Sequence, residues 1–270
     1  MPADPAAPGA GTLTVLGSSS STPRPGRACS CYLVRAGDTA IALDLGTGSL
    51  SNLRRYLAPE DVSAVIISHM HPDHFLDVIP MRYALRYGPR ANARRVPLYL
   101  PPGGDTLLRR MTDVFGEEPP VDFLAVYDVR TYDPDSALEI GGVRVRFAAA
   151  KHFVPTYAIR CDVGGASVTY SADTALEPRV GALARGGDVF VCEATLLPDE
   201  AGACRRGHMS AREAGELARS AQTRRLVLSH YSSETNPMQL LSEARATFGG
   251  DVLVADDHLV LELAATPAAP

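Results

Sequence analysis

The distribution of apolar residues divides the chain into short β-branched runs and longer segments with helical spacing. Apolar or alternating runs predict strands near residues 11–17, 30–36, 39–45, 62–68, 96–100, 143–151, 156–162, 166–172, 188–193, 224–229 and 252–263. Apolar residues at helical spacing predict helices near 49–57, 74–87, 104–115, 175–185, 209–221 and 236–247. The two kinds of segment alternate without a long linker or a repeat, so the pattern alone predicts an α/β protein with mixed sheets.

The densest cluster of polar, ligand-type residues follows the predicted strand 62–68. Residues 69–74 read His-Met-His-Pro-Asp-His, and the ligand-type side chains among them are His69, His71, Asp73 and His74. They lie at the carboxyl end of a strand, where open α/β sheets place their sites. Imidazole and carboxylate groups together suit zinc, and also manganese or iron. A single histidine is usually a surface or core residue, but this density predicts a site for two metal ions.

Further ligand-type residues each follow a predicted strand directly. They are His152 after 143–151, Asp173 after 166–172 and His230 after the strand that ends at Ser229. Strands often end in polar residues, so each position alone carries little weight. Rigid strand ends can hold ligands while the loops beyond them shape a pocket. The joint pattern therefore predicts a metal site on the rim of a sheet.

With these residues in place, the chain resembles the metallo-β-lactamase fold hydrolases. Within them it is similar to the branch of the tRNA 3′-processing endonucleases (ribonuclease Z) and the bacterial cyclic-nucleotide phosphodiesterases. The resemblance rests on TLTVLG at 12–17 with its Ser-rich loop, IALDLGTG at 41–48, the His-rich block, His152, YSADT at 170–174, CEAT at 192–195, His208-Met-Ser and Ser229-His230. It implies a four-layer αββα sandwich, with two mixed β-sheets flanked by helices. We expect a single domain over residues 11–264, with flexible tails at 1–10 and 265–270.

The resemblance also implies how the ligands divide between two divalent metal ions. One ion would take His69, His71 and His152, the other would take Asp73, His74 and His230, and Asp173 would bridge them. Zn²⁺ is the expected metal, with Mn²⁺ or Fe²⁺ as alternatives, and a metal-bridging hydroxide would be the nucleophile. Asp73 could also orient or deprotonate the attacking water. Many antibiotic-hydrolysing relatives have a cysteine where this branch has an aspartate, which disfavours β-lactam cleavage.

Several other polar residues have expected roles. His208 precedes the capping box Ser210-Ala-Arg-Glu213, so it lies at a helix amino terminus that favours anions. The resemblance implies that His208 protonates the leaving alkoxide, and a surface loop histidine is the alternative. Asp44 ends a buried strand, and we expect it to orient the histidines rather than bind metal. Glu193 ends another strand, where a functional and a structural role are both open, and we expect His258 to be structural or exposed.

The composition is that of an ordinary folded protein. The chain has 270 residues, of which 46% are hydrophobic and 21% charged, enough for one large core. No apolar run reaches membrane-spanning length, and the amino terminus lacks the basic and apolar regions of a secretory signal. The cysteines are odd in number and form no Cys-x-x-Cys pair, which favours reduced thiols. We therefore expect a cytoplasmic protein without a membrane partner.

Two observations bear on the substrate. The net charge of −5 argues against an extended nucleic-acid surface. The tRNA-processing relatives carry a long arm between the ligands equivalent to His152 and Asp173, whereas 21 residues separate these positions here, room for little more than a hairpin. A local basic stretch either lines a phosphate entrance or is a solvated helix end, and comprises Arg82, Arg86, Arg90, Arg94 and Arg95. A small phosphodiester such as a cyclic nucleotide is the favoured substrate.

The leading prediction is a phosphodiesterase that cleaves a cyclic nucleotide. One alternative is an RNA 3′-end-processing endonuclease of the ribonuclease Z type, in which a dimer would supply the basic surface. Another is a metal-dependent acyl or thioester hydrolase, because a fold does not determine a function. A non-catalytic metal-binding protein is disfavoured by the complete ligand set. The resemblance suggests a homodimer.

Overall fold

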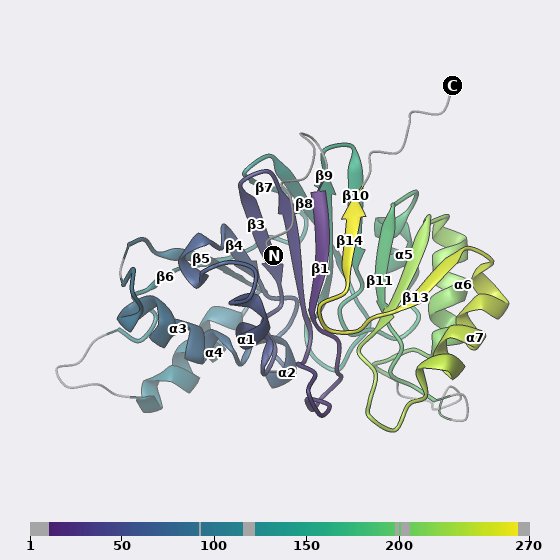
Figure 1. The fold of residues 1–270 in the computed structure, drawn as a ribbon, viewed down its shortest axis with the longest axis horizontal. Coiled ribbons are helices and arrows are strands. Elements are labelled where there is room, and N and C mark those ends of the chain that lie inside the picture. Colours follow the sequence, from purple (N-terminus) through teal and green to yellow (C-terminus); the bar gives the residue numbers. More distant parts are fainter. Residues whose placement is uncertain (1–10, 92, 116–121, 198–199, 201–205, 264–270) are drawn as a thin grey trace.

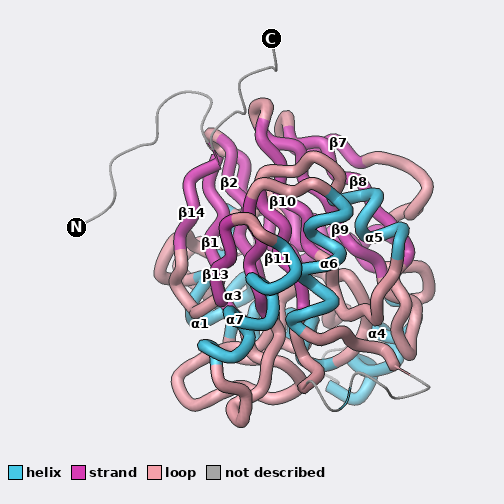
Figure 2. The backbone as a smooth tube through the Cα atoms, turned by 90° about the vertical axis from the view of Figure 1, so that its right-hand side faces the viewer, coloured by secondary structure: helices cyan, strands magenta, loops and turns pink. Residues whose placement is uncertain are grey.

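The computed structural model describes residues 11–91, 93–115, 122–197, 200 and 206–263. Within these residues the chain forms two seven-stranded sheets with helices on their outer faces (Figure 1). Figure 2 shows the same layers turned by 90°, with strands of both sheets between the helices. The expected four-layer αββα sandwich is confirmed. The two tails predicted to be flexible, 1–10 and 265–270, lie outside the described residues, as does residue 264.

The first sheet carries the amino-terminal half of the chain and one late strand. Its order is β14 (Val260–Leu263), β1 (Gly11–Gly17), β2 (Cys31–Ala36), β3 (Thr39–Leu43), β4 (Ala64–Ile66), β5 (Val96–Leu100) and β6 (Tyr127–Thr131). The pairs from β14 to β3 are antiparallel, and those from β3 to β6 are parallel. The sheet is therefore mixed, and β3 to β6 all end at one edge.

The second sheet has the same construction. Its order is β13 (Asp251–Val254), β12 (Arg225–Ser229), β11 (Val189–Glu193), β10 (Ala166–Tyr170), β9 (Tyr157–Val163), β8 (Val143–Ala149) and β7 (Leu138–Ile140). The pairs from β7 to β10 are antiparallel, and those from β10 to β13 are parallel. Since β9 and β10 join through Gly164 and Gly165, both at positive φ, the interval between His152 and Asp173 is a tight hairpin, as predicted.

Three apolar clusters hold the layers together. The central one lies between the sheets, where Leu13 and Val34 of the first sheet pack with Val145 and Val168 of the second. A second cluster joins the first sheet to α1 (Ser49–Leu53), α2 (Pro72–Phe75), α3 (Val78–Tyr87) and α4 (Gly104–Thr112). A third joins the second sheet to α5 (Pro178–Ala184), α6 (Ala211–Ala221) and α7 (Pro237–Phe248). Two 3₁₀ helices, Pro59–Asp61 and Asp113–Phe115, complete the described elements.

The structure corrects several predicted boundaries. The strand predicted at 252–263 is two strands, β13 and β14, which belong to different sheets. The helix predicted at 74–87 is two helices separated by Leu76 and Asp77, and the Asp77 carboxylate accepts a 2.7 Å hydrogen bond from the Leu50 amide. The short strands β6 and β7 were not predicted, and their side chains are largely only half-buried or exposed.

Two further expectations concern cysteines and membranes. Cys29, Cys31, Cys161 and Cys192 are all buried and unpaired, in agreement with reduced thiols, and Cys204 lies outside the described residues. No helix in the described ranges combines the length and apolar character needed to cross a membrane.

Candidate metal centre

The His-rich block forms the turn that leads from β4 into α2, at the lower edge of the sandwich in Figure 1. His71 is extended, with φ −83° and ψ 144°, and Pro72 occupies the first helical position. Proline suits that position because its fixed φ matches a helix and it needs no amide donor there. The turn therefore places His69 and His71 before the helix and Asp73 and His74 within it.

The first cluster joins this turn to the second sheet. Nε2 of His152, in the loop after β8, lies 3.1 Å from Nδ1 of His71. Oδ2 of Asp173, in the loop after β10, lies 3.7 Å from Nε2 of His69 and 3.8 Å from Nε2 of His152. All four ligand-type atoms lie within 4.8 Å of one another.

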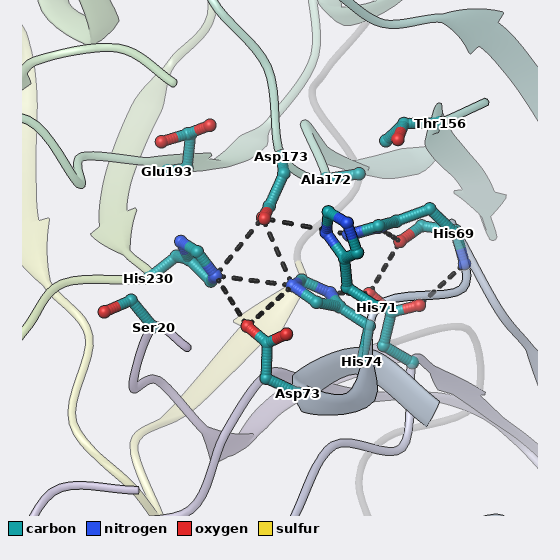
Figure 3. Close-up of polar contacts among 12 residues, drawn as sticks. Ser20, His69, His71, Asp73, His74, Thr156, Ala172, Asp173, Glu193 and His230 are labelled. Atoms are coloured by element: carbon teal, nitrogen blue, oxygen red, sulfur yellow. Dashed lines mark hydrogen bonds and ion pairs between the residues drawn. The ribbon is translucent and has the colours of Figure 1, made fainter. Parts of the chain in front are cut away.

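The second cluster lies on the other side of Asp173 (Figure 3). Nε2 of His74 and Nε2 of His230 are 3.3 Å apart, and each lies 3.3 Å from Oδ1 of Asp173. Oδ2 of Asp73 is 3.4 Å from His74 Nε2 and 3.3 Å from His230 Nε2. Ligands on a tetrahedral ion with bonds of about 2.0 Å lie about 3.3 Å apart, so this spacing fits such an ion.

Asp173 is common to both clusters. Its Oδ2 faces His69 and His152, while its Oδ1 faces His74 and His230. The seven residues predicted as ligands are therefore brought together in two groups, and Asp173 is the shared member that the resemblance implied.

Hydrogen bonds on the far side of His69 and His74 orient their rings. His74 Nδ1 donates to Asp44 Oδ2 at 2.7 Å. Ser68 donates its hydroxyl proton to the same oxygen at 2.8 Å, so it can accept from His69 Nδ1, 3.0 Å away. Because Nδ1 of each ring is engaged in this way, Nε2 is the nitrogen that faces its cluster and that would bind a metal.

The same arrangement holds for His152 and His230. His152 Nδ1 donates to the Gly207 carbonyl oxygen at 2.7 Å. The Thr195 hydroxyl donates to Glu193 Oε2 at 2.7 Å, which leaves it to accept from His230 Nδ1 at 2.8 Å. Each residue thus presents its Nε2 to the site.

The protonation of the centre reflects its buried carboxylates. Burial lowers the pKa of His69 well below its ordinary value, and the neighbouring His74 adds to this effect. Burial opposes the charge of His74 too, but Asp173 and Asp44 outweigh it and raise the His74 pKa well above its ordinary value. For Asp173, His230 and His74 overcome burial and hold the pKa well below its usual range. Buried negative charge of this kind requires a positive partner.

Two buried polar atoms support a metal as that partner. His69 Nε2 and Asp173 Oδ1 have no hydrogen-bond partner within the described part of the chain. Such atoms normally find one, because an unsatisfied buried polar group costs about 1–3 kcal/mol. Both atoms face the clusters, so the donor set fits divalent metal ions.

Strained backbone surrounds the centre. Asp44, Ala172 and His230 have φ of 59°, 52° and 54°, a left-handed conformation that L-residues seldom adopt. Asp44 and His230 each follow a strand directly, and Ala172 lies two residues after β10. Asp44 contacts His74, Ala172 precedes Asp173, and His230 belongs to the second cluster. Strain of this kind persists where surrounding contacts enforce it and is frequent at functional sites.

His208 and Glu193 form a pair at the edge of the clusters. His208 Nδ1 lies 3.1 Å from Glu193 Oε1 and 4.0 Å from Asp173 Oδ2. Burial disfavours the charged imidazole, but the charge and hydrogen bond of Glu193 outweigh it and raise the His208 pKa to about 9. His208 is therefore a cation at neutral pH, held beside both clusters.

The structure also decides the residues whose roles were open. Asp44 contacts His74 and Ser68 and lies in neither cluster, as predicted. His258 is structural, because its Nδ1 pairs with the Tyr56 hydroxyl at 3.1 Å. Sequence reasoning assigned no role to Ser68 or Thr195, although each stands within two residues of a strand end, the signal that could have found them.

Three arginines of the basic stretch are engaged in contacts within the fold. Arg82 is 1% exposed and donates to the Phe123 carbonyl oxygen. Arg90 pairs with Asp61 at 2.7 Å, and Arg94 donates to the carbonyl oxygens of Glu60 and Val62. Arg90 and Arg94 contact the segment 60–62 that precedes β4, and Arg82 joins α3 to Phe123.

Comparison with known proteins agrees with this fold and site. The family described as Beta-lactamase superfamily domain matches residues 40–231. An uncharacterized protein of Mycobacterium leprae is 37% identical over 246 residues, covering 89% of this chain and 84% of that protein. The ribonuclease Z of Myxococcus xanthus is 29% identical over 300 residues, covering 93% of this chain and 97% of that protein.

The probable metallo-hydrolase YhfI of Bacillus subtilis is similar in both sequence and structure. It is 29% identical over 256 residues, covering 93% of this chain and 99% of YhfI. Its crystal structure, that of a metallo-β-lactamase fold protein, matches with a TM-score of 0.84 at 28% identity, over 94% of this chain and 99% of that chain.

Proposed function

The chain belongs to the metallo-β-lactamase superfamily, and on that premise we propose that it is a phosphodiesterase that uses two divalent metal ions, with a cyclic nucleotide as substrate. The observation that carries the proposal is the sharing of Asp173 between two clusters of nitrogen and oxygen donors. These donors suit Zn²⁺, and the proposed ligands are those of the two clusters. Two ions held there would polarise a phosphoryl oxygen and lower the pKa of an attacking water.

Asp73 is the proposed base. Burial raises the pKa of its carboxyl group, but hydrogen bonds from His230 and His74 outweigh this and lower it, so the group is ionised. An ionised carboxylate at this position can orient the attacking water and accept its proton.

His208 is the proposed acid. Glu193 holds its Nδ1, which leaves Nε2 to donate a proton to the oxygen that departs from phosphorus. The departing group of a cyclic nucleotide is a sugar alkoxide, a poor leaving group that needs this proton. The positive charge of His208 also favours an anionic phosphodiester over a neutral ester.

The size of the proposed substrate follows from the hairpin of β9 and β10. This hairpin occupies the interval between His152 and Asp173, in which a tRNA-gripping arm would have to lie. A net charge of −5 adds no general attraction for nucleic acid. Both observations favour a small phosphodiester over tRNA.

The test is hydrolysis of 3′,5′-cyclic AMP and bis(p-nitrophenyl) phosphate by zinc- and manganese-loaded protein. We expect turnover of both, lost in Asp73→Asn and retained in Asp133→Asn, an exposed carboxylate that belongs to neither cluster. Cleavage of the synthetic diester alone would reject the cyclic substrate, and precursor tRNA would then test RNA 3′-end processing. Inactivity on both with metals bound, together with cleavage of an acyl thioester, would overturn the proposal in favour of the acyl hydrolase.

A further inference from the structure

Phe153 is a large apolar side chain on the rim of the metal centre. It follows His152 in the loop between β8 and β9, and it is 64% exposed. Its ring centroid lies 5.1 Å from that of His152 and 6.1 Å from that of His208. Single exposed apolar residues are common on proteins, so exposure alone does not indicate a binding site. The position of Phe153, in contact with a proposed ligand and beside the proposed acid, is what sets it apart.

Gly207 provides the surface against which this ring lies. A Cβ atom at Gly207 would lie 2.5 Å from Phe153 Cε2 and 2.8 Å from His152 Nδ1, closer than such atoms can approach. The Gly207 carbonyl oxygen also accepts the hydrogen bond from His152. The absence of a side chain here therefore lets one residue orient His152 and support the Phe153 ring, most of which remains exposed.

We propose that Phe153 is the platform on which the nucleobase of the substrate stacks. The inference rests on the proposed function, since it places a phosphodiester at the metal centre. In a nucleotide the base is one sugar ring away from the phosphate, which brings it to the rim that Phe153 occupies. Aromatic rings stack on every base, and loss of such a contact weakens binding by about 10-fold. Phe153 thus selects nucleotides over phosphodiesters that lack a base.

A fluorescence experiment tests this stacking without relying on turnover. The chain contains no tryptophan, so Phe153→Trp introduces a single indole fluorophore. We expect adenosine 5′-monophosphate to quench its emission in the metal-loaded protein, with a saturable curve, and ribose 5-phosphate to leave it unchanged. Tyr87→Trp is the matched control, because Tyr87 is 63% exposed and lies on α3.

The outcomes separate the two proposals. Equal responses to both phosphates, or equal quenching in Phe153→Trp and Tyr87→Trp, would overturn the stacking site and leave an active phosphodiesterase as proposed. Base-dependent quenching in a protein that hydrolyses no phosphodiester would support the site and reject the proposed function.

Kinetics provide a second test with a substitution that keeps an apolar side chain. We compare kcat/KM for 3′,5′-cyclic AMP with kcat/KM for methyl riboside 3′,5′-cyclic phosphate, which has no base. We expect Phe153→Leu to lower this ratio by about 10-fold. Tyr87→Leu should keep the ratio of the parent protein. An unchanged ratio in Phe153→Leu would contradict the inference.

Discussion

Asp44 Oδ2 accepts a 2.7 Å hydrogen bond from His74 Nδ1, and both side chains are fully buried. The same oxygen accepts hydrogen bonds from the Ser68 and Tyr170 hydroxyls, each at 2.8 Å. One carboxylate therefore orients His74 directly and His69 through Ser68. Asp44 directly follows β3, which pairs with β4, the strand that leads into the metal-binding turn.

We expect Asp44→Asn to weaken metal binding without removing a ligand. Asparagine tolerates the left-handed backbone at this position, but it lacks the charge that holds His74 Nδ1 in the protonated state. Loss of such a contact lowers metal affinity by about 10–100-fold. Titration with a competing chromogenic chelator measures the affinity, and Asp162→Asn, on β9, is the control. Parent-like affinity in Asp44→Asn would show that the pair does not orient the ligand.

Replacement of His208 should affect substrates according to their leaving groups. A general acid contributes about 10²–10⁴-fold when the leaving oxygen is a poor one, so His208→Gln should lower kcat for 3′,5′-cyclic AMP by that factor. p-Nitrophenolate departs without a proton, and kcat for bis(p-nitrophenyl) phosphate should fall much less. His258→Gln should resemble the parent protein. Equal losses on both substrates would argue that His208 positions the phosphate instead of donating a proton.

The His208–Glu193 pair should set the alkaline limit of activity. Because the His208 pKa is raised from 6.5 to about 9, the acid form is present at neutral pH and kcat/KM should fall as the pH rises through about 9. Glu193→Gln removes the charge that outweighs burial, so this limb should move toward lower pH, while Glu216→Gln leaves it in place. An alkaline limb at the same pH in Glu193→Gln would contradict the assignment.

The same shift affects stability in the same direction. A group with a raised folded-state pKa stabilises the folded protein fully below its ordinary pKa and loses that contribution as the pH rises through the folded value. For the His208 pKa the window runs from 6.5 to about 9. Thermal unfolding across this range should show a loss that Glu193→Gln reduces.

Metal removal should lower the melting temperature. Ions that bind only the folded chain stabilise it by about 4 kcal/mol at 1,000 times their Kd, which corresponds to about 10 °C for a protein of this size. Calorimetry with and without a chelator measures the difference. Asp173→Asn, which changes the shared ligand, should reduce the chelator effect, and Asp162→Asn should preserve it. A melting temperature indifferent to chelator would mean that the clusters hold no metal in solution.

Local patterns predicted elements well where a short run of apolar and β-branched residues is buried throughout. The run Ala166–Tyr170 is buried along its whole length and is the strand expected there. The prediction of one strand over 252–263 was wrong because apolar residues stand on both sides of Asp256 and Asp257. Their polar turn lets the chain leave the second sheet at β13 and enter the first at β14, a choice made by long-range pairing.

By itself the sequence determined which side chains are available and where each stands relative to a strand end. Strand periodicity and residue chemistry are local properties, so they were sufficient to place His152, Asp173 and His230 on the rim of a sheet. Only the tertiary structure decided that the two oxygens of Asp173 face different clusters, that Glu193 raises the pKa of His208, and that Gly207 supports Phe153. Those relationships join residues far apart in the chain, and their distances are set by the packing of the two sheets and of the loops at their edge.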